Sequence, residues 1–434
     1  MSNLLERLFH LKEHGSNVKT ELLAGLTTFS TMAYIIVVNP AILSSTGMDF
    51  GAVMVATILA ASFATLFMGL CANYPFALAP SMGLNAYFTY GVVTALGLSW
   101  QTALAACFFA AVTLIILNIT GIRQALLEAT PACLRIGTTS GIGIFLAFIG
   151  LKETKLVIQH PDTFVTLGNI AEPYAAMTLA GVIIITALLA YQVRGAILWA
   201  ILILWGIGLA TGLTEWKGLT AMPPSIAPTL FSLDFASALD PRVIGVTLSF
   251  VFVMIFDAAG TLLSLCSHGE FLDEQAKIPR VRKALSADAL GSLFGSLLGT
   301  SPMSNYLESA AGITSGGRTG LTSTIVGLLF LITLFFSPLA TAIPSFATSA
   351  AMIMIGALMT SQLKKLPWDD ISEMVPGFIT LVAIPLTFNI AAGIGLGFIA
   401  FALLKLLTGK ARETSPLIWV ITALFIGAQL SIKI

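Results

Sequence analysis

The chain has 434 residues, of which 57% are hydrophobic and only 10% are charged. Soluble domains usually carry about 25% charged residues, so the composition excludes a single water-soluble globular domain and makes the lipid bilayer the expected surrounding. The 21 basic and 21 acidic residues give a formal net charge of zero. The basic residues are scattered in short loops and form no basic face, which argues against nucleic acid as a partner.

The N-terminal stretch MSNLLERLFHLKEHGSNVKTELLAG is amphipathic and charged. It lacks the apolar segment and the small-residue cleavage site of a signal peptide. We expect an interfacial helix on the cytoplasmic side that leads into the first membrane span.

Fourteen apolar stretches predict an all-α polytopic membrane protein, because a spanning helix needs roughly 20 apolar residues. The stretches are 22–43, 52–71, 76–95, 101–119, 135–152, 174–191, 196–213, 243–265, 284–300, 301–315, 320–338, 344–361, 373–389 and 391–408. A further apolar run, 416–432, could be an extra span, a re-entrant segment or an interfacial helix.

The basic residues also predict the orientation, since cytoplasmic loops of membrane proteins are enriched in lysine and arginine. With the N-terminus in the cytoplasm, 16 of the 21 basic residues fall on the cytoplasmic side. They are Arg7, Lys12, Lys19, Arg123, Arg135, Arg194, Lys277, Arg280, Arg282, Lys283, Arg318, Lys364, Lys365, Lys405, Lys410 and Arg412. We therefore expect a cytoplasmic N-terminus.

The third and tenth stretches are interrupted. They open with YPFALAPSMGLNAYFTYG (74–91) and LLGTSPMSNYLESAAG (297–312), each with an extended apolar piece, a break with Pro80 or Pro302, and a helix-compatible run. Proline fits the first turn of a helix but not its interior, so each helical half should begin inside the bilayer. Two such elements of opposite direction, seven spans apart, indicate inverted repeats with the substrate site where they meet.

Two carboxylates lie at membrane depth, Asp257 in the eighth stretch and Glu308 in the tenth. Ionisable side chains there are costly, and each indicates a functional site. The alternative is an acid that only links helices by hydrogen bonds. Asp288, Lys152 and Glu153 stand near span ends, where we expect them to reach water.

Glu308 follows Pro302 by six residues and should stand at the start of the internal half-helix. The unpaired N–H groups of a helix start favour an anion, and a carboxylate can accept two adjacent hydrogen bonds. This chemistry fits a heterocycle that presents neighbouring N–H donors. Asn85 has the comparable position after Pro80 and could hydrogen-bond either a polar ring or another helix.

Asp257, Thr261, Ser264 and His268 share one face of the eighth span. They could form a proton route from Asp257 to the cytoplasm or a polar stripe that faces other helices. In the first span, Tyr34 could lie against a flat ligand.

Other chemistries find no support in the sequence. Cys71, Cys107, Cys133 and Cys266 have no metal-ligand spacing and are expected to be packing thiols. The segment GGRTG (316–320) lacks the lysine of a phosphate loop and predicts a tight turn. We find no set of a nucleophile and a base, so we expect neither an enzyme nor a metal site, and transport would be passive or driven by an ion gradient.

Four segments, TTFSTMAYIIVVNP, APSMGLNAYFTY, FDAAGTL and LLGTSPMSNYLESAAGITSGGRTGLT, resemble the AzgA-like purine permeases of the nucleobase–cation symporter-2 family. The likeness extends from about residue 10 to residue 410. It implies fourteen spans in two inverted repeats of seven, with short strands in spans 3 and 10. The core domain would hold spans 1–4 and 8–11, and the gate domain spans 5–7 and 12–14. The repeats would be 1–213 and 241–409, followed by a C-terminal apolar segment, 410–434.

The resemblance also implies the site. Glu308, Asp257 and Asn85 would bind the base, with Ala86 and Leu307 beside them. Glu308, Asp257 and His268 are the candidates for carrying a coupled proton, and no other cofactor is implied. Relatives often function as dimers, so a homodimer is expected.

The implied function is a secondary active transporter in the plasma membrane that imports purine nucleobases by proton symport with alternating access. Guanine or hypoxanthine would be the first substrates and adenine the next. Two alternatives remain open, a passive nucleobase channel and an anion exchanger of the same architecture. An anion exchanger would need a basic residue near the breaks, and the sequence suggests none there.

Overall fold

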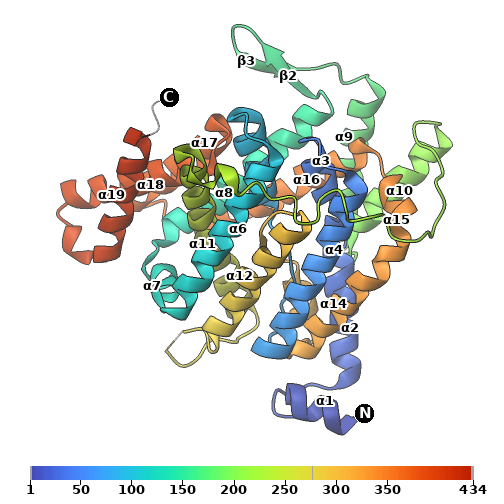
Figure 1. The fold of residues 1–434 in the computed structure, drawn as a ribbon, viewed down its shortest axis with the longest axis horizontal. Helices are drawn as coiled ribbons and strands as arrows, with labels where there is room; N and C mark the ends of the chain where they lie inside the picture. Colours follow the sequence, from blue (N-terminus) through green and yellow to red (C-terminus); the bar gives the residue numbers. More distant parts are fainter. Residues whose placement is uncertain (1, 276, 432–434) are drawn as a thin grey trace.

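The computed structural model describes residues 2–275 and 277–431, which are mostly helical (Figure 1). The first half contains α1 Ser2–Phe9, α2 Val18–Met32, α3 Ile35–Ser44, α4 Phe50–Phe67, α5 Met82–Ala86, α6 Trp100–Ile119, α7 Ile122–Ala129, α8 Ala132–Glu153, α9 Pro173–Ala190 and α10 Ala196–Ala210. The second half contains α11 Pro241–His268, α12 Val281–Leu298, α13 Ser309–Thr314, α14 Gly320–Thr333, α15 Ser337–Thr341, α16 Ser345–Thr360, α17 Ile371–Thr387, α18 Ile390–Leu407 and α19 Pro416–Ser431. The strands are β1 Leu78–Pro80, β2 Val157–His160, β3 Phe164–Leu167 and β4 Met303–Asn305.

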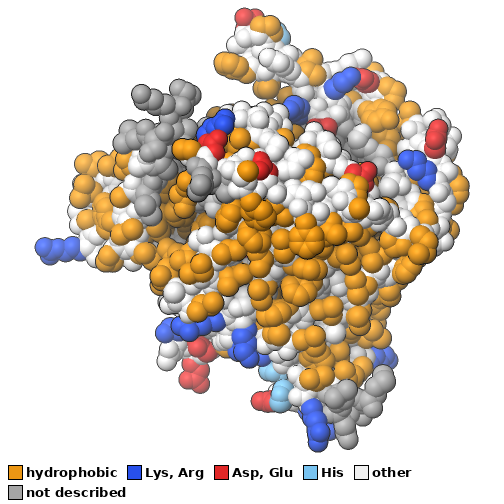
Figure 2. Space-filling view, in the orientation of Figure 1, with side chains coloured by type: hydrophobic (Ala, Val, Ile, Leu, Met, Phe, Trp, Pro, Cys, Tyr) orange, Lys and Arg blue, Asp and Glu red, His pale blue; other side chains and the backbone are white. Residues whose placement is uncertain are grey.

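Nine helical stretches of the described chain are long and apolar enough to cross a bilayer, and they match nine of the fourteen expected spans. Two further expected spans are the shorter apolar helices α10 and α17. The expected ninth span is α12, which carries Arg282, Lys283 and Asp288. Figure 2 shows an apolar band across the molecule with charged side chains above and below it. This surface fits a protein that crosses a bilayer.

The two interrupted stretches do contain strands, which pair with each other. β1 and β4 form an antiparallel ladder in which Ala79 lies opposite Ser304. The N–H of Ser81 donates to the carbonyl of Pro302 at 2.9 Å, and that of Tyr306 donates to Ala77 at 3.0 Å. In this alternation Pro80 and the residue opposite it form a pair that exchanges no backbone hydrogen bonds. The missing N–H of proline therefore costs the ladder nothing.

After each of the two strands the chain continues as a helix that begins near the ladder. α5 follows β1 and continues as a π-helix over Tyr87–Ala95, while α13 follows β4. The hydroxyl of Tyr306 donates to the carbonyl of Pro80 at 2.6 Å and adds a side-chain link between the two segments. The breaks therefore form one joint structure.

The helices pack into two groups. We call the set α2, α3, α4, α6, α11, α12 and α14 the first bundle, and the set α8, α9, α10, α16, α17 and α18 the second bundle. Small residues allow close approach within each bundle. A Cβ on Gly320 would lie 1.9 Å from the carbonyl oxygen of Gly69, and one on Gly143 would lie 2.6 Å from that of Gly356.

The segment GGRTG forms the expected turn, and a buried acid holds it. Glu21 on α2 is fully buried. Its carboxylate accepts the N–H of Arg318 at 3.0 Å and both the N–H and the hydroxyl of Thr322, at 3.2 and 2.6 Å. Because these donors lie at the start of α14, Glu21 ties α2 to that helix end.

One expectation about charge is wrong. Asp288 does not reach water: it is 1% exposed and forms an ion pair with Arg123, which is also 1% exposed. Arg123 was expected in a cytoplasmic loop, but its guanidinium also donates to the carbonyl of Leu285 at 2.7 Å. The short helix α7 brings the arginine against α12, which local sequence does not reveal. Lys152 and Glu153 are exposed, as expected.

The C-terminal segment 410–434 is helical over α19, and residues 432–434 lie outside the described chain. α19 packs on α18, and the ring of Phe425 lies 4.6 Å from that of Phe252 and 5.8 Å from that of Phe398. These contacts attach α19 to α11 and α18.

Candidate functional site

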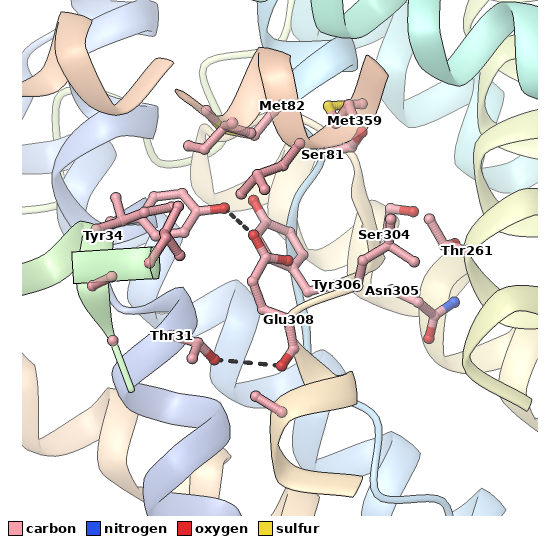
Figure 3. Close-up of a pocket in the computed structure, with 18 of the residues that line it drawn as sticks. Thr31, Tyr34, Ser81, Met82, Thr261, Ser304, Asn305, Tyr306, Glu308 and Met359 are labelled. Carbon is pink, nitrogen blue, oxygen red and sulfur yellow. Dashed lines mark hydrogen bonds between the residues drawn. The ribbon is translucent and has the colours of Figure 1, made fainter. Parts of the chain in front are cut away.

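A cavity of about 510 Å³ lies where the β1–β4 ladder meets both bundles (Figure 3). From the first bundle and the breaks it is lined by Thr31, Tyr34, Ser81, Met82, Gly83, Asp257, Thr261, Ser304, Asn305, Tyr306, Leu307, Glu308 and Ala311. From the second bundle and its loops it is lined by Leu189, Gln192, Val193, Arg194, Gly195, Ala196, Ile197, Ile355, Leu358, Met359 and Gln362. A largely apolar lining with a few polar groups is typical of a small-molecule site.

Glu308 stands immediately before α13, at the predicted start of the internal half-helix. The Tyr34 hydroxyl donates to its Oε1 at 2.5 Å, and the Thr31 hydroxyl donates to its backbone carbonyl at 3.4 Å (Figure 3). Tyr34 lies between α2 and α3, where bonds such as Ile36 N–H to Ala33 O tighten the helix to three-residue spacing. This interruption places the tyrosine against the carboxylate.

Asp257 enters the same cavity from the middle of α11. Its Oδ2 accepts a hydrogen bond of 2.8 Å from the hydroxyl of Ser81, the first residue after β1. The backbone carbonyl of Asp257 accepts from Thr261 at 2.8 Å. Each carboxylate is therefore oriented by a hydroxyl, and the two acids border one space.

Asn305 is a lining residue that sequence reasoning missed. It is the last residue of β4 and only 2% exposed, yet neither its amide nitrogen nor its amide oxygen has a hydrogen-bond partner within the described chain. A buried polar group without a partner is costly. A polar ligand that both donates and accepts would remove this cost. An amide within a strand at membrane depth was the signal that could have identified it.

The other predicted residues separate into two sets. Leu307 lines the cavity beside Glu308. Asn85 and Ala86 are fully buried and are not among the lining residues, because the Asn85 Oδ1 accepts from the hydroxyl of Ser301 instead. Asn85 therefore joins the two breaks in this conformation.

His268 lies away from the cavity. It ends α11, is exposed, and lies with its Nε2 3.0 Å from the hydroxyl of Thr314 on α13. Of the four polar residues on that face of α11, Asp257 and Thr261 line the cavity.

Arg194 corrects the expectation that no basic residue lies near the breaks. It belongs to the loop between α9 and α10, far from both breaks in the sequence, and it lines the cavity. No side-chain hydrogen bond or ion pair holds it within the described residues. The fold, rather than any local pattern, brings this loop to the site.

Comparison with known proteins decides the family. The sequence model of the family Xan_ur_permease, described as Permease family, matches residues 19–396. The chain belongs to this permease family. Transport is therefore the activity that the family name indicates.

Named relatives cover almost the whole permease. The putative permease MJ0326 of Methanocaldococcus jannaschii is 50% identical over 97% of each chain. The adenine permease AdeP of Escherichia coli is 43% identical over 98% of this chain and 95% of its own. The guanine/hypoxanthine permease PbuO of Bacillus subtilis is 41% identical over 96% of this chain and 98% of its own.

The fold has solved counterparts. The transmembrane domain of the cyanobacterial bicarbonate transporter BicA matches with a TM-score of 0.66 and 18% identity, over 86% of this permease and 97% of that domain. At this identity the match shows the shared transporter fold and not a shared substrate.

Proposed function

We propose that this permease imports purine nucleobases by proton symport with alternating access across the plasma membrane. The observation that carries the proposal is the convergence of Glu308 and Asp257, each oriented by a hydroxyl, on one cavity between the two bundles. The relatives named adenine and guanine/hypoxanthine permeases supply the substrate class.

The lining matches the edge and the face of a purine. Each carboxylate accepts hydrogen bonds from ring or exocyclic N–H groups, and the free amide of Asn305 can both donate and accept. The Tyr34 ring and apolar residues such as Met82 and Met359 offer surfaces for a flat ring. Guanine or hypoxanthine present adjacent N–H donors and are the preferred substrates of this proposal, with adenine next.

Proton coupling follows from the cost of an unpaired charge. A carboxylate without a neutralising partner resists passage through a dry environment. Protonation of Glu308 or Asp257, together with a neutral base, would let the first bundle move against the second. In this scheme the first bundle is the core domain and the second is the gate domain of a fourteen-span protein with a cytoplasmic N-terminus, working as a homodimer. Asn85 and Ala86 would bind the base only after the hydroxyl of Ser301 releases the Asn85 amide.

The test is uptake of radiolabelled purine by vesicles that contain Glu308→Gln. The amide keeps the size of the side chain and loses its charge, so uptake should fall to background while the amount of protein in the membrane is unchanged. Glu153→Gln is the matched control, because Glu153 is exposed outside the cavity. Normal uptake by the Glu308 variant would refute the assignment. Competition by unlabelled adenine, guanine, hypoxanthine, xanthine and uracil then ranks the substrates.

Two other transport classes are tested in the same vesicles. A passive channel would give no accumulation against a gradient and no loss on collapse of the proton gradient. Anion exchange has one observation in its favour, the exposed and unpaired Arg194 at the edge of the cavity lining. It predicts bicarbonate or chloride exchange that Arg194→Gln abolishes, whereas purine symport predicts no such exchange.

A further inference from the structure

A second cavity, of about 300 Å³, adjoins the first. The two share three lining residues, Thr261, Leu307 and Gln362. The second cavity is bounded by the start of α8, the C-terminal part of α11 and the 3-10 helix Ser361–Lys365. It therefore lies between the two bundles, as the first cavity does.

Basic side chains line the second cavity. Of the lining residues that the structure describes, Arg135 and Lys365 are charged and none is acidic. Within the described chain, neither of these two side chains makes a hydrogen bond or an ion pair, although Arg135 is half-buried. Ala132 at the start of α8 also lines the cavity, and the helix has no side-chain cap at Pro131. Unpaired N–H groups at such a helix start favour an anion.

Free hydroxyls lie beside these charges. Serine and threonine inside helices usually return a hydrogen bond to the carbonyl four residues earlier, as Thr261 does at 2.8 Å. Thr139, Ser264 and Ser267 line the second cavity and make no hydrogen bond within the described residues. Two basic groups, three unused hydroxyls and a helix start together form a site for an oxyanion with further hydroxyl groups.

We propose that the two cavities together bind a purine nucleoside monophosphate from the cytoplasmic side and that this ligand inhibits transport. The inference rests on the proposed purine site, since the base would occupy the first cavity. The ribose would face the hydroxyls of α11, and the phosphate would lie between Arg135 and Lys365. Both basic residues are in loops or helix starts that the sequence places in the cytoplasm.

Inhibition, rather than transport, follows from where the contacts lie. Arg135 belongs to α8 of the second bundle, and Lys365 follows α16 of the same bundle. Ser264 and Ser267 belong to α11 of the first bundle. The base alone also borders both bundles and is carried, but the phosphate adds contacts that link the bundles and a charge that opposes passage through a dry environment. The permease would thereby respond to the phosphorylated form of its own cargo.

The experiment measures displacement of radiolabelled base from detergent-purified permease by the series base, nucleoside and nucleoside monophosphate. A charge-assisted contact is worth roughly a factor of ten in affinity, so the monophosphate should compete about tenfold better than the nucleoside. In the double variant Arg135→Gln, Lys365→Gln this advantage should disappear while affinity for the base is unchanged. The double variant Lys364→Gln, Arg412→Gln removes the same two charge types from exposed positions outside both cavities and should retain the advantage.

Each outcome of this experiment either supports or overturns the nucleotide site. Equal competition by nucleoside and monophosphate in the wild type would overturn the phosphate site. An advantage that survives in the Arg135 and Lys365 variant would do the same, as would inorganic phosphate displacing the base as well as the monophosphate does. If the wild type binds none of the bases, the proposed function fails and the nucleotide site falls with it.

Discussion

Replacing Tyr34 with phenylalanine tests how the carboxylate of Glu308 is held. The change deletes one hydroxyl and leaves the ring in its packed position, since Tyr34 is 1% exposed. It removes the 2.5 Å hydrogen bond to the Glu308 Oε1. The carboxylate would then be free to take other orientations along the wall of the cavity.

The structure gives the size of the expected effect. A hydrogen bond to a charged group contributes about 1.5–3 kcal/mol. Glu308 borders a cavity of about 510 Å³, so a water molecule can replace the lost hydroxyl, and the lower end of this range applies. Because about 1.4 kcal/mol corresponds to a factor of ten, we expect purine binding to weaken about tenfold.

The measurements are the Kd for the base in detergent and the KM for uptake in vesicles. Tyr174→Phe is the matched control, because Tyr174 packs against Phe346 outside the cavity. In the Glu308→Gln background the Tyr34 substitution should add little, since residues that act through one contact are not additive. Wild-type affinity in Tyr34→Phe would refute the proposed role of this hydrogen bond.

Three further predictions concern stability and packing. Asp288→Asn should lower the Tm in detergent, because removing one partner of a buried ion pair costs about 3–5 kcal/mol. Adding Arg123→Met should restore part of the loss. An unchanged Tm in Asp288→Asn would contradict the buried pair. Gly312→Ala would place a Cβ 2.0 Å from the Thr28 hydroxyl, so purine binding should weaken, and Thr28→Ala should recover part of it. Hydrogen bonds from the hydroxyl and the N–H of Ser372 hold the pKa of Asp370 below its ordinary value. The charged carboxylate of Asp370 therefore contributes to the stability of the folded protein at neutral pH, and this contribution is lost as pH falls below the unfolded value of about 3.9. Asp370→Asn should lower the Tm at neutral pH but not in acid.

Local signals were enough to predict the breaks and the acids. Pro80 ends β1 just before α5, and Pro302 directly precedes β4, so each proline marks a break in its span although only Pro80 stands at a strand-to-helix junction. Glu308 stands where the half-helix begins. Asp257 was recognisable by its cost at membrane depth alone.

Tertiary packing determined what the sequence did not indicate. Arg194 lines the cavity because the fold brings the loop after α9 to it, and nothing near the residue in the chain indicates this position. Asp288 looked accessible by its distance from a span end, yet α7 covers it with Arg123. Asn85 occupies the expected place in its break, but its side-chain oxygen accepts a hydrogen bond from the hydroxyl of Ser301 and does not line the cavity.

The β1–β4 ladder joins residues from opposite halves of the chain, and its side-chain link from Tyr306 to Pro80 spans 226 positions. A ribosome that has delivered only the first half into the membrane has therefore made no binding site at all. Two separately expressed halves, divided in the loop before α11, should each be inert and regain purine binding when produced in the same cell. The pocket can therefore form only after the second half of the permease has entered the membrane.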